Sequence, residues 1–301
     1  MIEIKSTDHF FSFSSKNRPV VKISSGTILE VETMDCFSNQ IQSPSDTLNS
    51  IDWSKINPAT GPIFVEEAEE GDTLKIDIMN ISIANQGVIV SGKGEGLLGH
   101  LMDDIHVKIV QIKKDMIIFD SKLSIPVNKM IGVIGVAPKI GEISCGIPGP
   151  HGGNMDNMMI TTGSTLYLPV YTKGALLGIG DLHAAMGDGE VGVSGVEVAG
   201  NVKIRVRVLK NLNIKDPILS DDQDFTTISS AKTIDAAIKQ SAEEMANILK
   251  ERLPLNMHEI VMLMSISGHA EICQVVDPLK TARFVMPNWI LNTYKFDLTS
   301  S

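Results

Sequence analysis

Residues 61–85 of the chain are GPIFVEEAEEGDTLKIDIMNISIAN, and this stretch decides the fold class. An apolar run is followed by an acidic turn at Gly71-Asp72, and then Leu74, Ile76 and Ile78 alternate with other residues. Alternation with a period of two is typical of a strand that buries one face, and glycine beside aspartate marks the turn between two strands. The stretch therefore predicts a strand, a turn and a second strand.

The same plan recurs along most of the first 210 residues. Residues 20–33, 105–127 and 164–181 each divide into short apolar runs separated by turn residues. Residues 202–210, VKIRVRVLK, place basic side chains in alternation with apolar ones, which is typical of a half-buried strand with a charged face. We therefore expect a mainly β protein with a β-sandwich or jelly-roll body.

The pattern changes near residue 210. Residues 233–253 predict a helix, with Ser230 or Thr233 as its N-cap. Its apolar face would hold Ile234, Ala237, Ile238, Ser241, Met245, Ile248 and Leu249. Residues 257–267 predict a second helix, with a strand as the alternative because the segment is so rich in apolar residues. Residues 270–278 predict a return to β structure that ends at Pro278. We expect a β-rich body over 1–215 that carries the functional site, and a smaller α+β section over 216–301.

The composition excludes several classes of partner. The net charge of −10 disfavours nucleic acid and anionic membranes, because both reward basic patches. No secretory signal opens the chain, and its longest apolar run, 130–138, is too short to cross a bilayer. Cys36, Cys145 and Cys273 are odd in number and widely spaced, so they form no disulfide framework. These features predict a cytoplasmic protein.

Neither the glycine motifs nor the nucleophile motifs of the sequence predict a functional site. Two G-x-G-x-x-G matches, at 94–99 and 187–192, lack the strand–turn–helix context of a dinucleotide site. In the second match Asp188 and Glu190 would repel a phosphate. The chain has no G-x-S-x-G elbow, and its single cysteines are interpreted as small buried apolar residues.

Histidine and carboxylate residues gather instead on glycine-rich turns. They are His100 with Asp103 and Asp104, His151 with Asp156, Asp181 with His183, and Asp188 with Glu190. On an extended segment, an Asp-x-His pair points both side chains to one side with the Cα atoms about 7 Å apart, which suits two ligands of one ion. Such oxygen and nitrogen ligands favour zinc, with calcium or another divalent ion as the alternative.

Five segments of the chain resemble the acetamidase/formamidase family in their order and spacing. They are 57–74 (NPATGPIFVEEAEEGDTL), 149–156 (GPHGGNMD), 166–170 (LYLPV), 180–191 (GDLHAAMGDGEV) and 272–287 (ICQVVDPLKTARFVMP). The resemblance covers nearly the whole chain. It implies hydrolysis of short-chain amides to a carboxylate and ammonia, a β-rich body with a smaller α+β section, and a homo-oligomer, for which a dimer is favoured.

These observations lead to a specific hypothesis, metal-assisted hydrolysis of formamide- or acetamide-type substrates. The expected metal ligands are Asp181, His183 and His100, and either Glu190 or Asp188 is the general base. The expected substrate-binding groups are His151, Asn154 and the backbone N–H groups of Gly152 and Gly153. The alternative hypothesis is a non-catalytic β-sandwich module that binds a small polar ligand and is stabilised by a metal ion.

Overall fold

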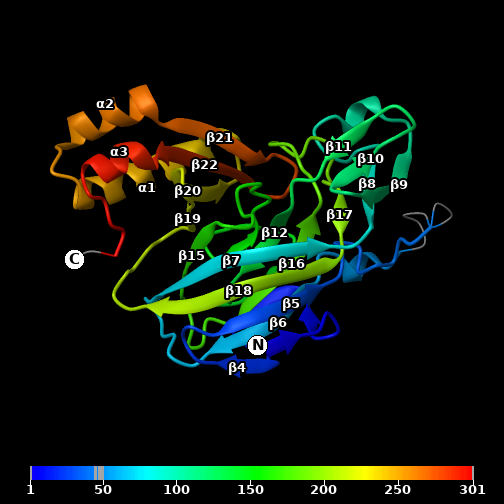
Figure 1. Cartoon of the computed structure of the whole chain (residues 1–301), viewed down its shortest axis with the longest axis horizontal. Helices are drawn as coiled ribbons and strands as arrows, with labels where there is room; N and C mark the ends of the chain where they lie inside the picture. Colours follow the sequence, from blue (N-terminus) through cyan, green and yellow to red (C-terminus); the bar gives the residue numbers. More distant parts are fainter. Residues whose placement is uncertain (1, 44–45, 47–50, 300–301) are drawn as a thin grey trace.

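Two large β-sheets pack face to face in the computed structural model, which describes residues 2–43, 46 and 51–299 (Figure 1). The first sheet has nine strands among the described residues, in the order β1 (Ile2–Ile4), β5 (Ile28–Thr33), β18 (Gly200–Leu209), β7 (Thr73–Ile83), β15 (Thr165–Pro169), β19 (Ile218–Ser220), β20 (Asp224–Ala231), β22 (Lys280–Pro287) and β21 (His269–Gln274). The predicted mainly β fold is confirmed.

The second sheet has eleven strands within the same described ranges. Its main path is β11 (Ser124–Pro126), β10 (Met116–Ile118), β9 (Ile105–Lys113), β8 (Gln86–Gly92), β17 (Glu197–Val198), β16 (Leu177–His183), β12 (Met130–Gly135) and β14 (Gly152–Asn154). Beside β16 lies β6 (Ala59–Val65), which also pairs with β2 (His9–Phe10) and β4 (Val21–Ile23). A separate pair is formed by β13 (Glu142–Ser144) and β3 (Ser12–Ser14), and short 3-10 turns are η1 (Trp53–Lys55) and η2 (Gly99–Leu101).

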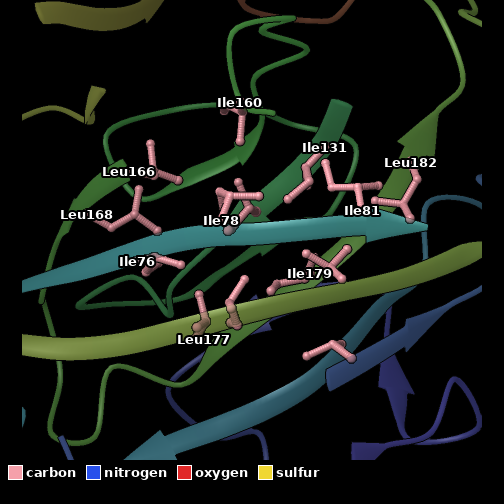
Figure 2. Close-up of a cluster of buried hydrophobic side chains, with 14 of the residues drawn as sticks. Ile76, Ile78, Ile81, Ile131, Ile160, Leu166, Leu168, Leu177, Ile179 and Leu182 are labelled. Carbon is pink, nitrogen blue, oxygen red and sulfur yellow. The ribbon is translucent and has the colours of Figure 1, made fainter. Parts of the chain in front are cut away.

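The main hydrophobic core lies between the two sheets. Ile76, Ile78 and Ile81 of β7 belong to the same buried cluster as residues of β12 and β16, and Figure 2 shows these side chains meeting between the strands. The partners on the second sheet are Ile131, Ile179 and Leu182. Full burial of one such side chain is worth about 2 kcal/mol. The alternation that predicts the strand at 73–83 is thus the alternation that fills the core.

The C-terminal helices α1 (Ile234–Arg252), α2 (Met257–Ser267) and α3 (Asn288–Thr293) lie at one end of the molecule beside β20 to β22 (Figure 1). The helix predicted at 233–253 is confirmed. Thr233 is its N-cap, since its side chain accepts a hydrogen bond from the backbone N–H of Ala236. The helix predicted at 257–267 is also confirmed, and Asn256 and Glu259 form a capping box at its start.

The strand predicted at 270–278 is shorter than expected. β21 ends at Gln274, because the Gln274 side-chain oxygen accepts hydrogen bonds from the backbone N–H groups of Val276 and Asp277 and turns the chain. Strand β19, just after the proposed boundary at 215, pairs with β15, so one sheet runs through both sections. The division at 215 stays a prediction, as does the cytoplasmic location.

Among the described residues, none of the helices combines the length and apolar character that a membrane crossing requires.

Candidate active site

The end of β16 brings one histidine and several carboxylates together inside the protein. His183 Nε2 lies 3.1 Å from Glu197 Oε2, 3.4 Å from Asp181 Oδ1 and 3.8 Å from Asp156 Oδ1. Glu190 joins Asp156 and His183 in a group whose ligand atoms all lie within 4.8 Å of one another. All five side chains are buried. We call these five residues the acidic cluster.

Three members of the acidic cluster have a backbone conformation that is rare outside glycine. The φ angles are 41° at Asp156, 52° at Asp181 and 46° at Glu190. Such a conformation costs on the order of 1 kcal/mol and persists where the surrounding structure enforces it, often at functional sites. The Asp181 and His183 side chains converge as predicted, but the backbone at Asp181 is left-handed and not extended.

Two glycines make room for the cluster. A Cβ atom at Gly132 of β12 would lie 2.5 Å from Asp156 Oδ1 and 2.6 Å from Asp181 Oδ2. A Cβ atom at Gly195 would lie 2.7 Å from His183 Nδ1. All three distances are shorter than any normal contact, so any other residue at either position would displace the cluster. The absence of a side chain at Gly132 and Gly195 therefore allows the site residues to pack closely.

Burial and mutual repulsion set the charges of the cluster. Burial raises the pKa of Glu190 to about 8 and that of Glu197 to about 7, and it raises the pKa of Asp156 well above its usual range. Burial opposes the charged form of His183 as well, but the charges of Glu197 and Asp181 outweigh it and raise the His183 pKa well above 6.5. Burial also acts to raise the Asp181 pKa, and the adjacent His183 lowers it below its usual value. One imidazolium cannot balance so many carboxylates.

The donor set of the cluster fits a divalent metal ion. Asp156 Oδ1, Asp181 Oδ1, Glu197 Oε2 and His183 Nδ1 are buried and make no hydrogen bond within the described structure. Buried polar atoms are normally satisfied, and a cation would satisfy these oxygens and balance their charge. A second group with ligand-like spacing contains Cys36, Asp181 and Glu197. Oxygen and nitrogen donors in this number are typical of zinc and other divalent ions.

A cavity of about 400 Å³ adjoins the cluster, and Asp181, Glu190 and Glu197 form part of its wall. Asn154 and Asp277 line it too, and Asn154 Nδ2 donates a hydrogen bond to Asp277 Oδ2 at 3.0 Å. The other side-chain atom of this amide, Asn154 Oδ1, is buried and has no partner among the described residues. This acceptor can bind an N–H group of a small molecule in the cavity.

Two predicted site residues lie apart from the cluster. His100, the expected third metal ligand, is exposed on the turn η2 and belongs to neither group of ligand-like residues. Asp188, one candidate for the general base, has both carboxylate oxygens bound to Arg283, at 3.0 and 2.6 Å. A carboxylate held in a bidentate ion pair is poorly suited to accept a proton. Glu190 is the better placed of the two candidates.

The predicted substrate-binding groups at 151–153 also lie elsewhere. His151, Gly152 and Gly153 are buried, and none of them belongs to the cavity lining that the structure describes. The Gly152 N–H already donates to the carbonyl of Gly149, so it cannot bind an amide oxygen. A Cβ atom at Gly152 would lie 2.3 Å from the Ile134 carbonyl oxygen. These glycines are explained by close backbone packing.

His151 predicts a measurable pH effect on stability. Its ring packs edge-on against Phe13, and burial lowers its pKa to about 4. An unfolded histidine has a pKa of about 6.5, so between pH 6.5 and 4 the unfolded chain binds a proton that the folded chain does not. Stability from this residue is therefore lost as the pH falls through that range. The free energy of unfolding of the parent should fall between pH 7 and pH 4. We expect this fall to be smaller in His151→Gln by on the order of 3 kcal/mol.

Urea denaturation at a series of pH values measures this difference. His258→Gln is the matched control, since His258 is exposed on α2. The buried carboxylates contribute equally to parent and variants and cancel in the comparison. Equal pH dependence in the His151 variant and the parent would contradict a neutral buried imidazole.

Two residues at the site, Glu197 and Asp277, are not predicted from the sequence, because strand pairing and tertiary packing bring them there. Glu197 lies opposite His183 in the pairing of β17 with β16, and nothing in its local sequence marks it. Asp277 comes from the C-terminal section. That section also fixes the loop that carries Glu190, because Arg283 binds Asp188 and the Gly189 N–H donates to the Cys273 carbonyl. The available signal for Asp277 and Arg283 was the segment 272–287, one of the segments that resemble the family.

Comparison with known proteins identifies the family. The model of the Acetamidase/Formamidase family matches residues 13–144 and 142–292, which is nearly the whole chain. This chain belongs to the acetamidase/formamidase family. The sequence resemblance is thereby confirmed, and the segments that carry it include 180–191, which contains Asp181, His183 and Glu190.

Solved members of the family share the fold closely. A predicted acetamidase/formamidase from Thermoanaerobacter tengcongensis is 54% identical, covers 97% of both chains and superposes with a TM-score of 0.96. An acetamidase from Bacillus halodurans is 43% identical over 98% of this chain and 100% of that chain, also with a TM-score of 0.96. A candidate formamidase of Schizosaccharomyces pombe is 27% identical over 65% of this chain, and the match spans 64% of that protein's length.

Proposed function

We propose that this protein hydrolyses primary amides to a carboxylate and ammonia, with the help of a divalent metal ion held by the acidic cluster. The observation that carries the proposal is the buried convergence of His183, Asp156 and Asp181 beside a cavity whose wall includes Asp181. Membership of a family whose solved members include an acetamidase supports the reaction class. The unpartnered Asn154 Oδ1 in the same wall supports an amide as the ligand.

The proposed metal ligands are Asp156, Asp181 and His183, with Asp156 in place of His100. One oxygen of each of these carboxylates makes no hydrogen bond among the described residues, and the cluster carries a net negative charge. Both features favour a divalent cation, and zinc is the ion that we propose first. A bound divalent ion would supply positive charge that polarises the amide carbonyl and makes a water molecule more acidic. Homo-oligomer formation, with a dimer favoured, stays a prediction.

The chain's own groups would divide the remaining work. Asn154 Oδ1 would accept a hydrogen bond from the substrate N–H₂ group and so orient the amide. Glu190 would take a proton from the attacking water and transfer it to the leaving nitrogen. Burial raises the pKa of this carboxyl above its ordinary value, and a bound cation would lower it again, so the group can accept a proton and release it near neutral pH.

Cys145 is disfavoured as a nucleophile. Cys145 is fully buried, and its Sγ contacts the Phe10 carbonyl oxygen at 3.6 Å. Burial raises the pKa of this thiol far above its usual value, so it stays protonated at neutral pH. A thiol in that state cannot attack an amide.

The test is ammonia release from formamide and acetamide, combined with elemental analysis of the protein purified without added metal. We expect ammonia release that a chelator abolishes and that one equivalent of a divalent ion restores. Bound metal with no ammonia from any amide would favour the alternative, a non-catalytic metal-stabilised binding module. Full activity in a protein shown to be free of metal would contradict the metal-assisted mechanism.

A further inference from the structure

The cavity beside the acidic cluster is much larger than the smallest amides require. Its volume is about 400 Å³. Sites for drug-sized ligands typically have volumes of about 300 to 1,000 Å³, whereas one water molecule occupies about 30 Å³ in the liquid. Acetamide has only four non-hydrogen atoms. A substrate of that size would leave most of this cavity to solvent.

One wall of the cavity is apolar. Phe37 and Val90 line it and belong to one buried hydrophobic cluster, and Val193 lines the cavity and packs against that cluster. Ile147 and Pro278 are further apolar lining residues. The acidic cluster lies close to this wall. Cys36, which is next to Phe37 in the chain, has its Sγ within 4.8 Å of carboxylate oxygens of Asp181 and Glu197. A ligand in the cavity would therefore meet both carboxylates and hydrocarbon.

The conformation of Val193 is unusual and supports a role for its side chain. Its φ angle is 81°, a value that a β-branched residue rarely adopts and that glycine adopts freely. The same loop uses glycine at position 189, where φ is 99°. Hydrogen bonds hold the loop in place, from the Val193 N–H to the Glu190 carbonyl and from the Leu97 N–H to the Val191 carbonyl. The loop thus retains a strained valine at the position where its methyl groups form the apolar wall.

We propose that the preferred substrate is a neutral primary amide whose acyl group is apolar and larger than acetyl. The alkyl chain or ring would pack on Phe37, Val90 and Val193, and the amide group would lie at Asn154 and the acidic cluster. Anionic amides are excluded from this class, because no lysine or arginine lines the cavity among the described residues and several carboxylates do. The inference rests on the proposed amide hydrolysis and names its substrate class.

The first experiment compares kcat/KM for acetamide, butyramide, hexanamide, benzamide and the anion succinamate. Each methylene that becomes buried contributes about a fourfold gain. We therefore expect kcat/KM to rise by about 10² from acetamide to hexanamide and to be lowest for succinamate. Values that are highest for formamide or acetamide and fall with chain length would overturn the inference and leave the proposed function intact. No ammonia from any amide would overturn the proposed function itself.

The second experiment changes the apolar wall. Val193→Gly removes the methyl groups and suits the local backbone, so the variant should fold. We expect its hexanamide-to-acetamide ratio of kcat/KM to fall about tenfold. The control is Val191→Ala, because Val191 is exposed and lies outside the described lining of this cavity. A Val193→Gly variant with the ratio of the parent would overturn the placement of the acyl group.

Discussion

Glu190→Gln should lower kcat by about 10² to 10⁴ while leaving the metal content near that of the parent. The substitution keeps the shape of the side chain and removes its basicity. Glu190 is buried next to His183 and Asp156, and burial raises its pKa to about 8, so it can exchange a proton near neutral pH. The measurement is ammonia release under substrate saturation, with elemental analysis of the same preparations.

Two further variants make this result specific. Glu142→Gln removes one negative charge from an exposed position on β13 and should leave kcat unchanged. Asp188→Asn tests the other candidate base. Because it also removes the charge that pairs with Arg283, it loosens the loop that carries Glu190. An unchanged kcat with full metal in Glu190→Gln would end the assignment of this residue as the base. Loss of the metal in that variant would instead make Glu190 a ligand.

His183→Ala should remove the metal and the activity together. His183 provides the nitrogen donor of the acidic cluster, and its Nε2 lies within 3.8 Å of three carboxylates. Without the imidazole, the remaining oxygen donors should hold zinc much more weakly. We expect a metal content near zero, a loss of kcat of more than about 10³, and a fold that is retained by circular dichroism.

The matched control is His100→Ala, which removes an exposed imidazole from the turn η2. It should retain both metal and activity. His183→Asn provides a second measurement if the alanine variant is unstable, since it keeps a polar side chain among the buried carboxylates. A full complement of metal in folded His183→Ala would contradict the ligand assignment. Loss of metal in His100→Ala would restore the original ligand set.

The sequence predictions that are confirmed rest on local patterns of residues. The alternation of Leu74, Ile76 and Ile78 follows from the two-residue period of a strand, and these side chains are buried between the sheets. The apolar face of α1 repeats every three to four residues, and Thr233 caps it as expected. Both signals depend on neighbours in the chain, so no knowledge of the tertiary structure was needed.

For the candidate site, a local pattern was not sufficient. His100 and His183 both lie beside glycine, leucine and aspartate in the sequence, yet one is exposed on a turn and the other is buried at the end of β16. Burial depends on what packs around a segment, which its own residues do not encode. Gly132 is the clearest case, because only the arrangement of β12, β16 and the turn after β14 shows that it makes room for two carboxylates.

The sequence by itself determined the mainly β class, the C-terminal helices, the family, and the segment that carries Asp181, His183 and Glu190. The tertiary structure alone decided which other groups join them. Asp156, Glu197 and Asp277 come from segments far apart in the chain. Strand pairing brings Asp156 and Glu197 to His183, and the packing of the C-terminal section places Asp277 with Glu197 on the wall of one cavity. The reason is physical: periodicity and turn chemistry are properties of short segments, whereas the charge, burial and ligand geometry of a site depend on contacts between distant ones.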